Sequence, residues 1–390
     1  MSVTIRKVEN KVDFKAFFEF PWKLYQGYEH WIPELPSMRH ETLDRKKHAA
    51  WEYMEGDYFV AWRNSEPVGT IAAFVNHRHN ETHAENTGFF GFFECINDQE
   101  VANALFSMAE SYLREKGVEA LRGPANFSSN ELYGLLVDSF DKDPMMLMPY
   151  NPAYYVTLIE NAGFEKAMDL LSWRANFSTA YENVYEKNGE DKRIVRTVRK
   201  NMQRRAITVR TLDTRNKKRE FAALRDLYHQ AWEKNWGFIP MTERELDGLV
   251  KNLGMLVMPE YTYFGYVKDE LAGFMLLIPN FNQIFKHVDA RPGIPEAWWL
   301  LKTLWHWKIR PKVDSLRVVL FGVKEEFRGL GVDAALNLAL AEQMAKDRRN
   351  LAWAEASWIL ETNDNMNRLV ERFGAEMHRR HRIYQKLLLK

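Results

Sequence analysis

The chain is built from two copies of one pattern. Three segments in the first half have counterparts in the second half, at offsets of 204 to 211 residues and in the same order. The matched pairs are residues 3–6 with 207–210, 58–62 with 263–267, and 158–164 with 369–375. Three ordered matches indicate a duplication, so each half is expected to fold into the same set of elements.

The repeated pattern predicts an α+β fold in each half. The apolar runs at 58–62 and 263–267 each precede a polar turn and a second, glycine-led apolar run, which is typical of an antiparallel hairpin. The late match is typical of an amphipathic helix that ends at a glycine. We therefore expect two domains, at 1–178 and 207–390, each a mixed, mostly antiparallel twisted sheet flanked by helices. A basic linker or helix at 179–206 joins them.

Composition excludes several classes of protein. At 390 residues the chain is long enough for two domains of about 150–200 residues. The net charge of +1 gives no long-range attraction to nucleic acid. The longest uncharged runs, about 15 residues, are too short to span a bilayer, and a single cysteine, Cys95, excludes an intramolecular disulfide. Because the first residues lack an apolar signal core, we expect a cytoplasmic protein.

One segment of the second half carries a pattern suited to binding an anion. An apolar strand at 316–323 leads into a turn with two glycines, Gly329 and Gly331, and then into a long helix at 334–345. This order aims backbone N–H groups and a helix N-terminus at a negative charge. Glycines in the turn remove the Cβ atoms that would keep a diphosphate away from the backbone.

The segment Arg328-Gly-Leu-Gly331-Val-Asp333 resembles the pyrophosphate loop of the GNAT (GCN5-related N-acetyltransferase) superfamily. The resemblance covers nearly the whole second half. In the first half it covers the hairpin and the closing helix but not the loop, because residues 97–100 stand where the loop is expected. It implies acetyl-CoA or another acyl-CoA as co-substrate, with no metal. The residues it assigns to acyl-CoA are Phe321, Gly322, Val323, Arg328, Gly329, Leu330, Gly331, Val332, Asp333 and Asn363.

More narrowly, the whole chain resembles a group of bacterial tandem-GNAT proteins. The resemblance is carried by the segments 88–93 (Gly-Phe-Phe-Gly-Phe-Phe), 122–126 (Arg-Gly-Pro-Ala-Asn), 149–155 (Pro-Tyr-Asn-Pro-Ala-Tyr-Tyr) and 236–242 (Trp-Gly-Phe-Ile-Pro-Met-Thr). Some similar proteins are associated with N-acylation of long-chain amines. The acceptor implied is therefore a small-molecule or lipid-like amine.

The resemblance implies direct attack of an amine on a thioester, which requires a base. Alternation along 351–359 places Glu355 on one face of a strand, so Glu355 is the first candidate base and a structural ion pair is its alternative. Glu361 is the second candidate. Tyr384 is a candidate acid, because Val370 stands where many family members place the tyrosine that protonates the leaving thiolate.

Two hypotheses about function stay open. The first is an acyl-CoA-dependent N-acyltransferase that transfers an acetyl or longer group. The second is a catalytically inactive acyl-CoA or small-ligand binding protein on the same fold. Asp333, an acid at the last small position of the loop, and Val370 favour the second. The intact Arg328-Gly-Leu-Gly331 favours the first.

Three other segments have alternative interpretations. Residues 187–220 hold 13 Lys/Arg against four Asp/Glu, but no aromatic platform accompanies them, so a solvated helix is favoured over a nucleic-acid site. His77, His79 and His83 lack further ligands, so no metal site is expected. The tryptophan-rich segment 295–307 is typical of a core helix, with an acyl pocket or weak membrane-surface contact as alternatives. The sequence leaves the oligomeric state open.

Overall fold

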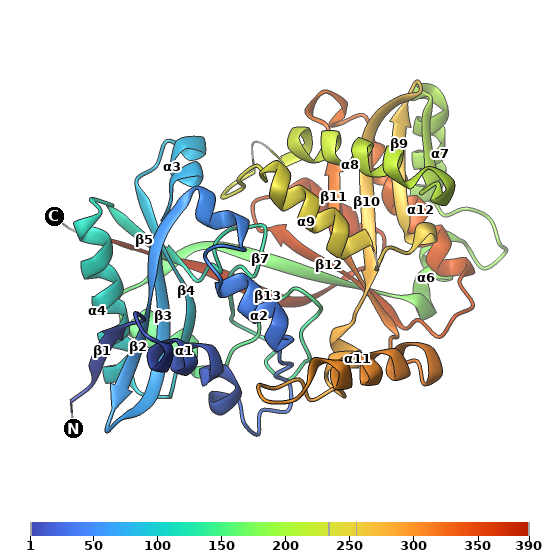
Figure 1. The fold of residues 1–390 in the computed structure, drawn as a ribbon. Helices are drawn as coiled ribbons and strands as arrows, with labels where there is room; N and C mark the ends of the chain where they lie inside the picture. The colour runs from blue at the N-terminus through green and yellow to red at the C-terminus, as the bar shows by residue number, and fades with distance from the viewer. Residues whose placement is uncertain (1, 233–234, 255, 389–390) are drawn as a thin grey trace. The chain divides into compact units, whose positions relative to one another are not determined.

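The protein, as a computed structural model, is described for residues 2–232, 235–254 and 256–388 (Figure 1). The chain forms two compact units. Unit 1 contains Met1–Leu170, Asn282–Lys312 and Arg379–Lys390, and unit 2 contains Leu171–Phe281 and Val313–His378.

Unit 1 is built on a sheet with the strand order β1, β2, β3, β4, β5 and the end of β13. Its neighbouring strands are antiparallel except for β4 and β5, which are parallel. The strands are β1 (Thr4–Lys7), β2 (Met54–Arg63), β3 (Glu66–Asn76), β4 (Thr87–Cys95), β5 (Ala120–Gly123) and β13 (Glu376–Leu387), with the short β6 (Leu135–Leu136) also paired to β13.

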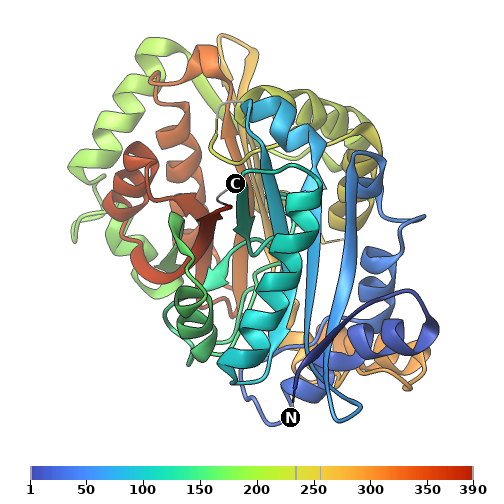
Figure 2. The same ribbon diagram turned by 90° about the vertical axis from the view of Figure 1, so that its left-hand side faces the viewer.

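Helix α4 (Gln99–Glu115) lies along one face of this sheet (Figure 2). Its apolar residues recur at helical spacing, and Leu105, Phe106 and Leu113 are buried against Phe90 of β4. The other helices of unit 1 are α1 (Lys11–Leu24), α2 (Pro36–Leu43), η1 (Ala49–Glu52), α3 (His77–His83), α5 (Tyr154–Asn161), α10 (Asn282–Phe285), α11 (Glu296–Leu304) and the turn η4 (Trp305–Ile309).

Unit 2 is built on a sheet with the order β12, β11, β10, β9 and β8, in which only β11 and β12 are parallel. Its strands are β8 (Ile207–Thr211), β9 (Thr262–Val267), β10 (Glu270–Pro279), β11 (Ser315–Val323) and β12 (Trp353–Leu360), and β7 (Glu165–Asn176) is the other neighbour of β12. Its helices are α6 (Phe177–Val184), α7 (Arg193–Arg205), η2 (Thr214–Asn216), α8 (Lys217–Trp232), α9 (Glu243–Gly254), η3 (Pro259–Tyr261), η5 (Glu325–Phe327), α12 (Val332–Lys346) and α13 (Asp364–Arg372).

The two halves of the chain contain the same series of elements. The series β1-α1-α2-β2-β3-β4-α4-β5-α5-β7 recurs as β8-α8-α9-β9-β10-β11-α12-β12-α13-β13. The predicted α+β fold is therefore confirmed. The offset between the matched segments grows from 204 to 211 residues along the chain, and this growth is not a single loop insertion. Residues 280–314 replace the short connection 77–86, whereas the long connection 124–153 shrinks to 361–363, so two large changes nearly cancel.

The compact units differ from the two sequence halves. The end of β13, from the second half, pairs with β5 in unit 1, from Ala120↔Leu387 to Gly123↔Tyr384. The inserted segment Asn282–Lys312 also belongs to unit 1. The division into compact units therefore follows contacts within the fold and not the order of the chain.

The segment expected as a basic linker forms α6 and α7 in unit 2. Val195 and Val198 of α7 are buried with Leu338 of α12, and Arg199 forms ion pairs with Asp191 and Glu342. Among the described residues, no helix is both long enough and apolar enough to cross a membrane.

Candidate functional site

In unit 2, the parallel strands β11 and β12 part halfway along their length. Their register runs from Ser315↔Trp353 to Val318↔Ala356, although β11 continues to Val323. At the same point the ladder with β10 contains an extra residue, Val319, since Leu277 faces Val318 and Leu276 faces Leu320. Such a bulge bends a strand and ends regular pairing. The backbone of Leu320–Val323 is therefore not paired with β12 in the described register.

The turn that follows β11 delivers the chain to the N-terminus of α12. Gly329 and Gly331 have φ of +73° and +95°, the left-handed region that favours glycine. Gly331 is the N-cap of α12, and as a glycine it has no side chain to accept from the first N–H groups of the helix. The first N–H groups of a helix have no partner within the helix, so an uncapped N-terminus after a glycine turn suits an anion.

Asn201 of α7 supports this glycine turn. Its side-chain Nδ2 donates to the carbonyl oxygen of Leu330 at 2.7 Å. A Cβ added at Gly331 would lie only 2.4 Å from the same nitrogen. The close fit requires glycine at 331 for space as well as for φ. Asn201 is not among the predicted site residues, because its segment is distinguished in the sequence only by its positive charge.

Asp333 lies in the first turn of α12, where a carboxylate opposes a bound anion but favours the helix. Its Oδ1 accepts from the N–H of Ala334 at 2.9 Å, and the residue is half-buried. One of the N–H groups at the helix N-terminus is therefore already hydrogen-bonded to this carboxylate.

The remaining residues assigned to acyl-CoA fall into two groups. Phe321, Gly322 and Val323 lie on β11 beyond the point where it parts from β12, and Arg328 Nε donates to the carbonyl of Val323 at 3.4 Å. By contrast, the side chain of Val332 is buried in the core against Gly265 and Gly273. Asn363 caps α13, where its Oδ1 accepts from Met366 N–H at 3.2 Å.

Glu355, the first candidate base, is fully buried on β12. Its Oε2 lies 2.6 Å from Nδ1 of His378, and the His378 ring also packs edge-on against Trp353. These contacts place Trp353 and Glu355 on one face, as alternation predicts. Arg317, which pairs with Glu355 in the β11–β12 register, donates to Ser357. The geometry of Glu355 therefore suits a buried ion pair.

The other two predicted catalytic residues lie in different surroundings. Glu361 is half-buried in the turn after β12. Tyr384 belongs to unit 1, where its ring is buried in the core and its hydroxyl donates to Glu160 at 2.9 Å. Burial raises the pKa of the Tyr384 phenol above its usual value. The structure thus assigns Tyr384 and the glycine turn to different units.

In unit 1, the equivalent parting of strands is filled by the chain itself. The parallel register of β4 and β5 ends at Phe89↔Arg122, and the chain then returns across β4. Asn126 Oδ1 accepts from the N–H of Phe92 at 2.9 Å, and a Cβ at Gly91 would lie 1.9 Å from the Ala125 oxygen. The α4 N-terminus is capped by Asp98, which accepts from Glu100 and Val101 N–H groups. An acyl-CoA has no equivalent place there.

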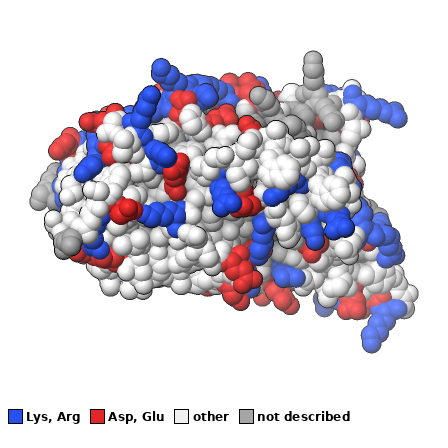
Figure 3. All heavy atoms as spheres, turned by 60° about the horizontal axis from the view of Figure 1, so that its bottom comes forward, with Lys and Arg blue, Asp and Glu red and all other residues white. Residues whose placement is uncertain are grey.

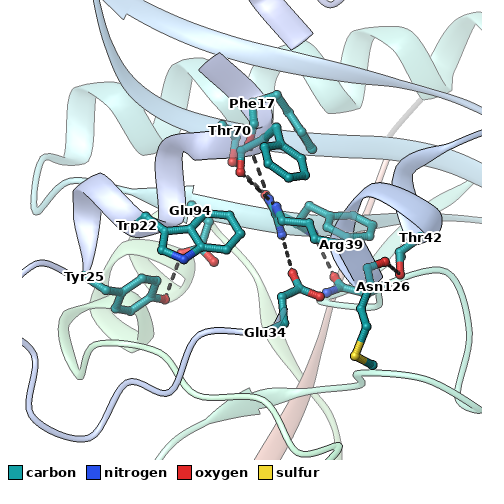
Figure 4. Close-up of polar contacts among 12 residues, drawn as sticks. Phe17, Trp22, Tyr25, Glu34, Arg39, Thr42, Thr70, Glu94 and Asn126 are labelled. Atoms are coloured by element: carbon teal, nitrogen blue, oxygen red, sulfur yellow. Dashed lines mark hydrogen bonds and ion pairs between the residues drawn. The ribbon is translucent and has the colours of Figure 1, made fainter. Parts of the chain in front are cut away.

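Unit 1 instead holds an ionisable cluster beside β4 that the sequence analysis missed (Figure 4). The Glu94 Oε2 atom accepts from the hydroxyls of Tyr25 (2.8 Å) and Tyr155 (2.7 Å). Burial raises the pKa of Glu94 to about 7, although both tyrosine hydrogen bonds act to lower it. The sequence signal for Glu94 is a lone acid inside an apolar strand, next to Cys95, whose thiol pKa is raised by burial.

The rest of this cluster is electrically balanced. Arg39 is buried, pairs with Glu34 at 2.9 Å and donates to the carbonyls of Phe17 and Phe18. The Arg39–Glu34 pair is neutral as a whole, so an ionised Glu94 leaves the cluster with a net negative charge.

The histidines at 77–83 are held by protein groups. His79 is buried, and its Nε2 lies 3.1 Å from Glu85 and 3.2 Å from the Arg122 guanidinium. Burial lowers the pKa of His79 to about 4, which keeps the ring neutral near pH 7. Across the described part of the chain, no group of three or more His, Cys, Asp or Glu side chains is arranged to hold a metal ion.

Comparisons with known proteins agree with this architecture. No family model matches the chain. It is 33% identical to Protein YghO of Escherichia coli (strain K12), with 98% of this chain and 95% of that protein aligned. It is 30% identical to the bacterial ceramide synthase of Caulobacter vibrioides (strain NA1000 / CB15N), with 99% and 98% aligned. A solved tandem GNAT protein from the clavulanic acid biosynthesis pathway superposes with a TM-score of 0.54 at 10% identity, covering 100% and 99% of the two chains.

Two repeats of the same α+β fold, one with parted parallel strands and a glycine turn, define a tandem GNAT protein. The chain belongs to the family of tandem GNAT proteins that contains these two full-length bacterial relatives.

Proposed function

We propose that the protein is an N-acyltransferase that transfers an acyl group from an acyl-CoA to an amine. The single observation that carries the proposal is the α12 N-terminus behind the Gly329–Gly331 turn, next to the end of β11 that is not paired with β12. In unit 1 the chain itself fills the corresponding place beside β4 and Asp98 caps α4, so the acyl-CoA is assigned to unit 2 alone. The ceramide synthase relative supports acyl transfer and suggests a lipid-like amine as acceptor.

The residues of unit 2 fit a diphosphate and a thioester. Backbone N–H groups at residues 329–332 would hold the diphosphate, and Arg328 would add a positive charge. On the side of β11 that is not paired with β12, the backbone near Gly322 and Val323 would bind the acyl-pantetheine arm and polarise the thioester carbonyl. The negative charge of Asp333 weakens the proposed phosphate site. Its carboxylate does not block that site, because it is hydrogen-bonded to the N–H of Ala334.

For deprotonation of the amine, we propose Glu355 and Glu361, the two predicted carboxylates that belong to unit 2 together with the glycine turn. An alkylammonium must lose a proton before it attacks, so one of these carboxylates must accept that proton, directly or through a water molecule. Glu355 is fully buried against His378 and is less suited to that role.

Titration calorimetry with coenzyme A, acetyl-CoA and palmitoyl-CoA tests the proposed function. Gly331→Trp is expected to abolish binding, because its side chain would collide with Asn201. Gly117→Trp is the control, since Gly117 also has positive φ but has no neighbouring atoms within 4 Å of an added Cβ. Failure of the wild type to bind any of the three ligands would refute the assignment.

Thioester turnover separates the enzyme from the alternative, a catalytically inactive acyl-CoA binding protein. Release of free thiol is measured with a panel of amines that includes long-chain amino alcohols. Glu361→Gln is expected to lower the rate more than tenfold, whereas Glu29→Gln, at an exposed acid in the loop between α1 and α2, should retain it. Binding without turnover by any amine would favour the inactive binding protein.

A further inference from the structure

Helix α11 exposes an unusually apolar surface. Four large apolar residues of the helix and the residue that follows it are between 46% and 61% exposed. They are Trp298, Leu300, Leu301, Leu304 and Trp305. Ile309, in the turn that follows, is also exposed. A soluble protein rarely leaves such a continuous apolar surface in water unless it contacts something.

The exposed residues form one arc of the helix. Successive residues of an α-helix are about 100° apart, so residues 298, 301 and 305 form one stripe and residues 300 and 304 lie beside it. Trp299 lies outside this arc and is only 5% exposed. The helix therefore buries Trp299 on one side and turns a second apolar face outward. The core helix predicted for residues 295–307 is therefore wrong for this face, which is exposed.

The segment that carries α11 is anchored to unit 1. The indole nitrogen of Trp22 donates to the carbonyl of Ala290 at 2.7 Å, and Lys286 Nζ lies 2.8 Å from Asp143. Asn282 also donates to the carbonyl of Pro144. The exposed face is thus a fixed surface of unit 1 rather than a loose arm.

Positive charge surrounds the apolar arc. Residues 282–312 contain six Lys/Arg and two Asp/Glu, whereas the net charge of the whole chain is only +1. Lys302 and Lys308 lie over the rings of Trp298 and Trp307, at 5.6 and 4.4 Å from the ring centroids. Figure 3, which brings the α11 side of the molecule forward, shows uncharged surface with Lys and Arg, and also Asp and Glu, at its edges.

We propose that this face of α11 binds the surface of an anionic membrane. Exposed tryptophans and leucines would enter the boundary between headgroups and acyl chains, and Lys302, Lys308, Arg310 and Lys312 would contact anionic headgroups. Charge complementarity distinguishes this partner from a second copy of the chain, which would place two basic surfaces together. The inference stands independently of the acyltransferase proposal, although a membrane would supply a lipid-like amine.

Vesicle co-sedimentation of the full-length protein tests this inference. Binding is expected to vesicles of phosphatidylcholine mixed with phosphatidylglycerol, and to be much weaker with phosphatidylcholine alone. Leu301→Ser should reduce the binding about tenfold. Leu387→Ser is the matched control, since Leu387 is a 66% exposed leucine elsewhere in unit 1, and it should bind like the wild type.

A second pair of variants tests the charge contribution. Lys308→Gln/Arg310→Gln should weaken binding to the anionic vesicles about tenfold. Arg196→Gln/Lys200→Gln removes the same charge from the exposed side of α7 and should have little effect. Equal binding by both double variants, or by Leu301→Ser and the wild type, would overturn the proposal. A dimer in light scattering that Leu301→Ser converts to a monomer would also overturn it, by assigning the face to a second copy.

Discussion

The side-chain amide of Asn201 donates to the Leu330 carbonyl at 2.7 Å, which links helix α7 to the glycine turn before α12. Asn201→Ala removes one hydrogen bond, worth about 1 kcal/mol, from the turn. We expect coenzyme A to bind about fivefold more weakly, as measured by calorimetry. Gln203→Ala, on the exposed side of the same helix, is the control. Equal affinities for the two variants would show that the turn holds its shape without Asn201.

Asp333 offers a test in the opposite direction. Its carboxylate lies in the first turn of α12 and accepts from Ala334 N–H. Asp333→Asn removes a negative charge next to the proposed diphosphate, so the affinity for coenzyme A should rise about threefold. The same change should lower the free energy of unfolding by about 0.5 kcal/mol, because the helix loses a favourable charge at its N-terminus. An unchanged affinity would place the bound phosphates away from this carboxylate.

Glu355 and Glu361 are expected to differ strongly in their contribution to stability. Glu355→Ala removes the carboxylate that lies 2.6 Å from the buried His378 ring and should cost about 3–5 kcal/mol of unfolding free energy. Glu361→Ala, in a half-buried turn, should cost less than about 1 kcal/mol. Urea unfolding of the two purified variants measures the difference. Similar losses would remove the argument that Glu355 is a structural group.

The fold was predictable because short-range sequence patterns, repeated in both halves, specify its elements. The hairpins, the glycine-ended helices and the turn at Gly329–Gly331 all depend on short-range patterns, and the structure contains each of them. The division into units was not predictable, because the pairing of Tyr384 with Gly123 joins segments far apart in the sequence. Residue spacing within one segment carries no information about such a partner.

The site was predictable only in part, for a related reason. The glycines of the turn are identified by a conformational need that is visible in the sequence. Asn201 and Glu94 have roles set by neighbours from other elements, namely the Leu330 carbonyl and the hydroxyls of Tyr25 and Tyr155. Nothing in the immediate sequence around Asn201 or Glu94 distinguishes them from ordinary polar residues.

The raised pKa of Glu94 makes stability depend on pH in a direction that can be tested. In the folded protein this pKa is about 7, against 4.5 for an ordinary glutamate. Between these values the folded chain holds a proton that the unfolded chain has lost, so the Glu94 contribution falls as the pH rises toward 7 and beyond. Tyr25, Tyr155, Arg39 and Glu34 are the titratable or charged groups around it, and burial dominates their effects.

Glu94→Gln keeps the shape of the side chain and removes the cost of ionising it. The variant should therefore be more stable than the wild type at pH 8, by at most about 3 kcal/mol, and should lose that advantage near pH 4. The neutral His79, whose pKa is about 4, makes stability rise with pH between about 4 and 6.5, but it does so equally in both proteins. Urea unfolding at pH 4 and pH 8, with Glu29→Gln as the control, measures the difference. A Glu94→Gln variant that is less stable at pH 8 would mean that the ionised carboxylate stabilises the fold, and that its pKa is not raised.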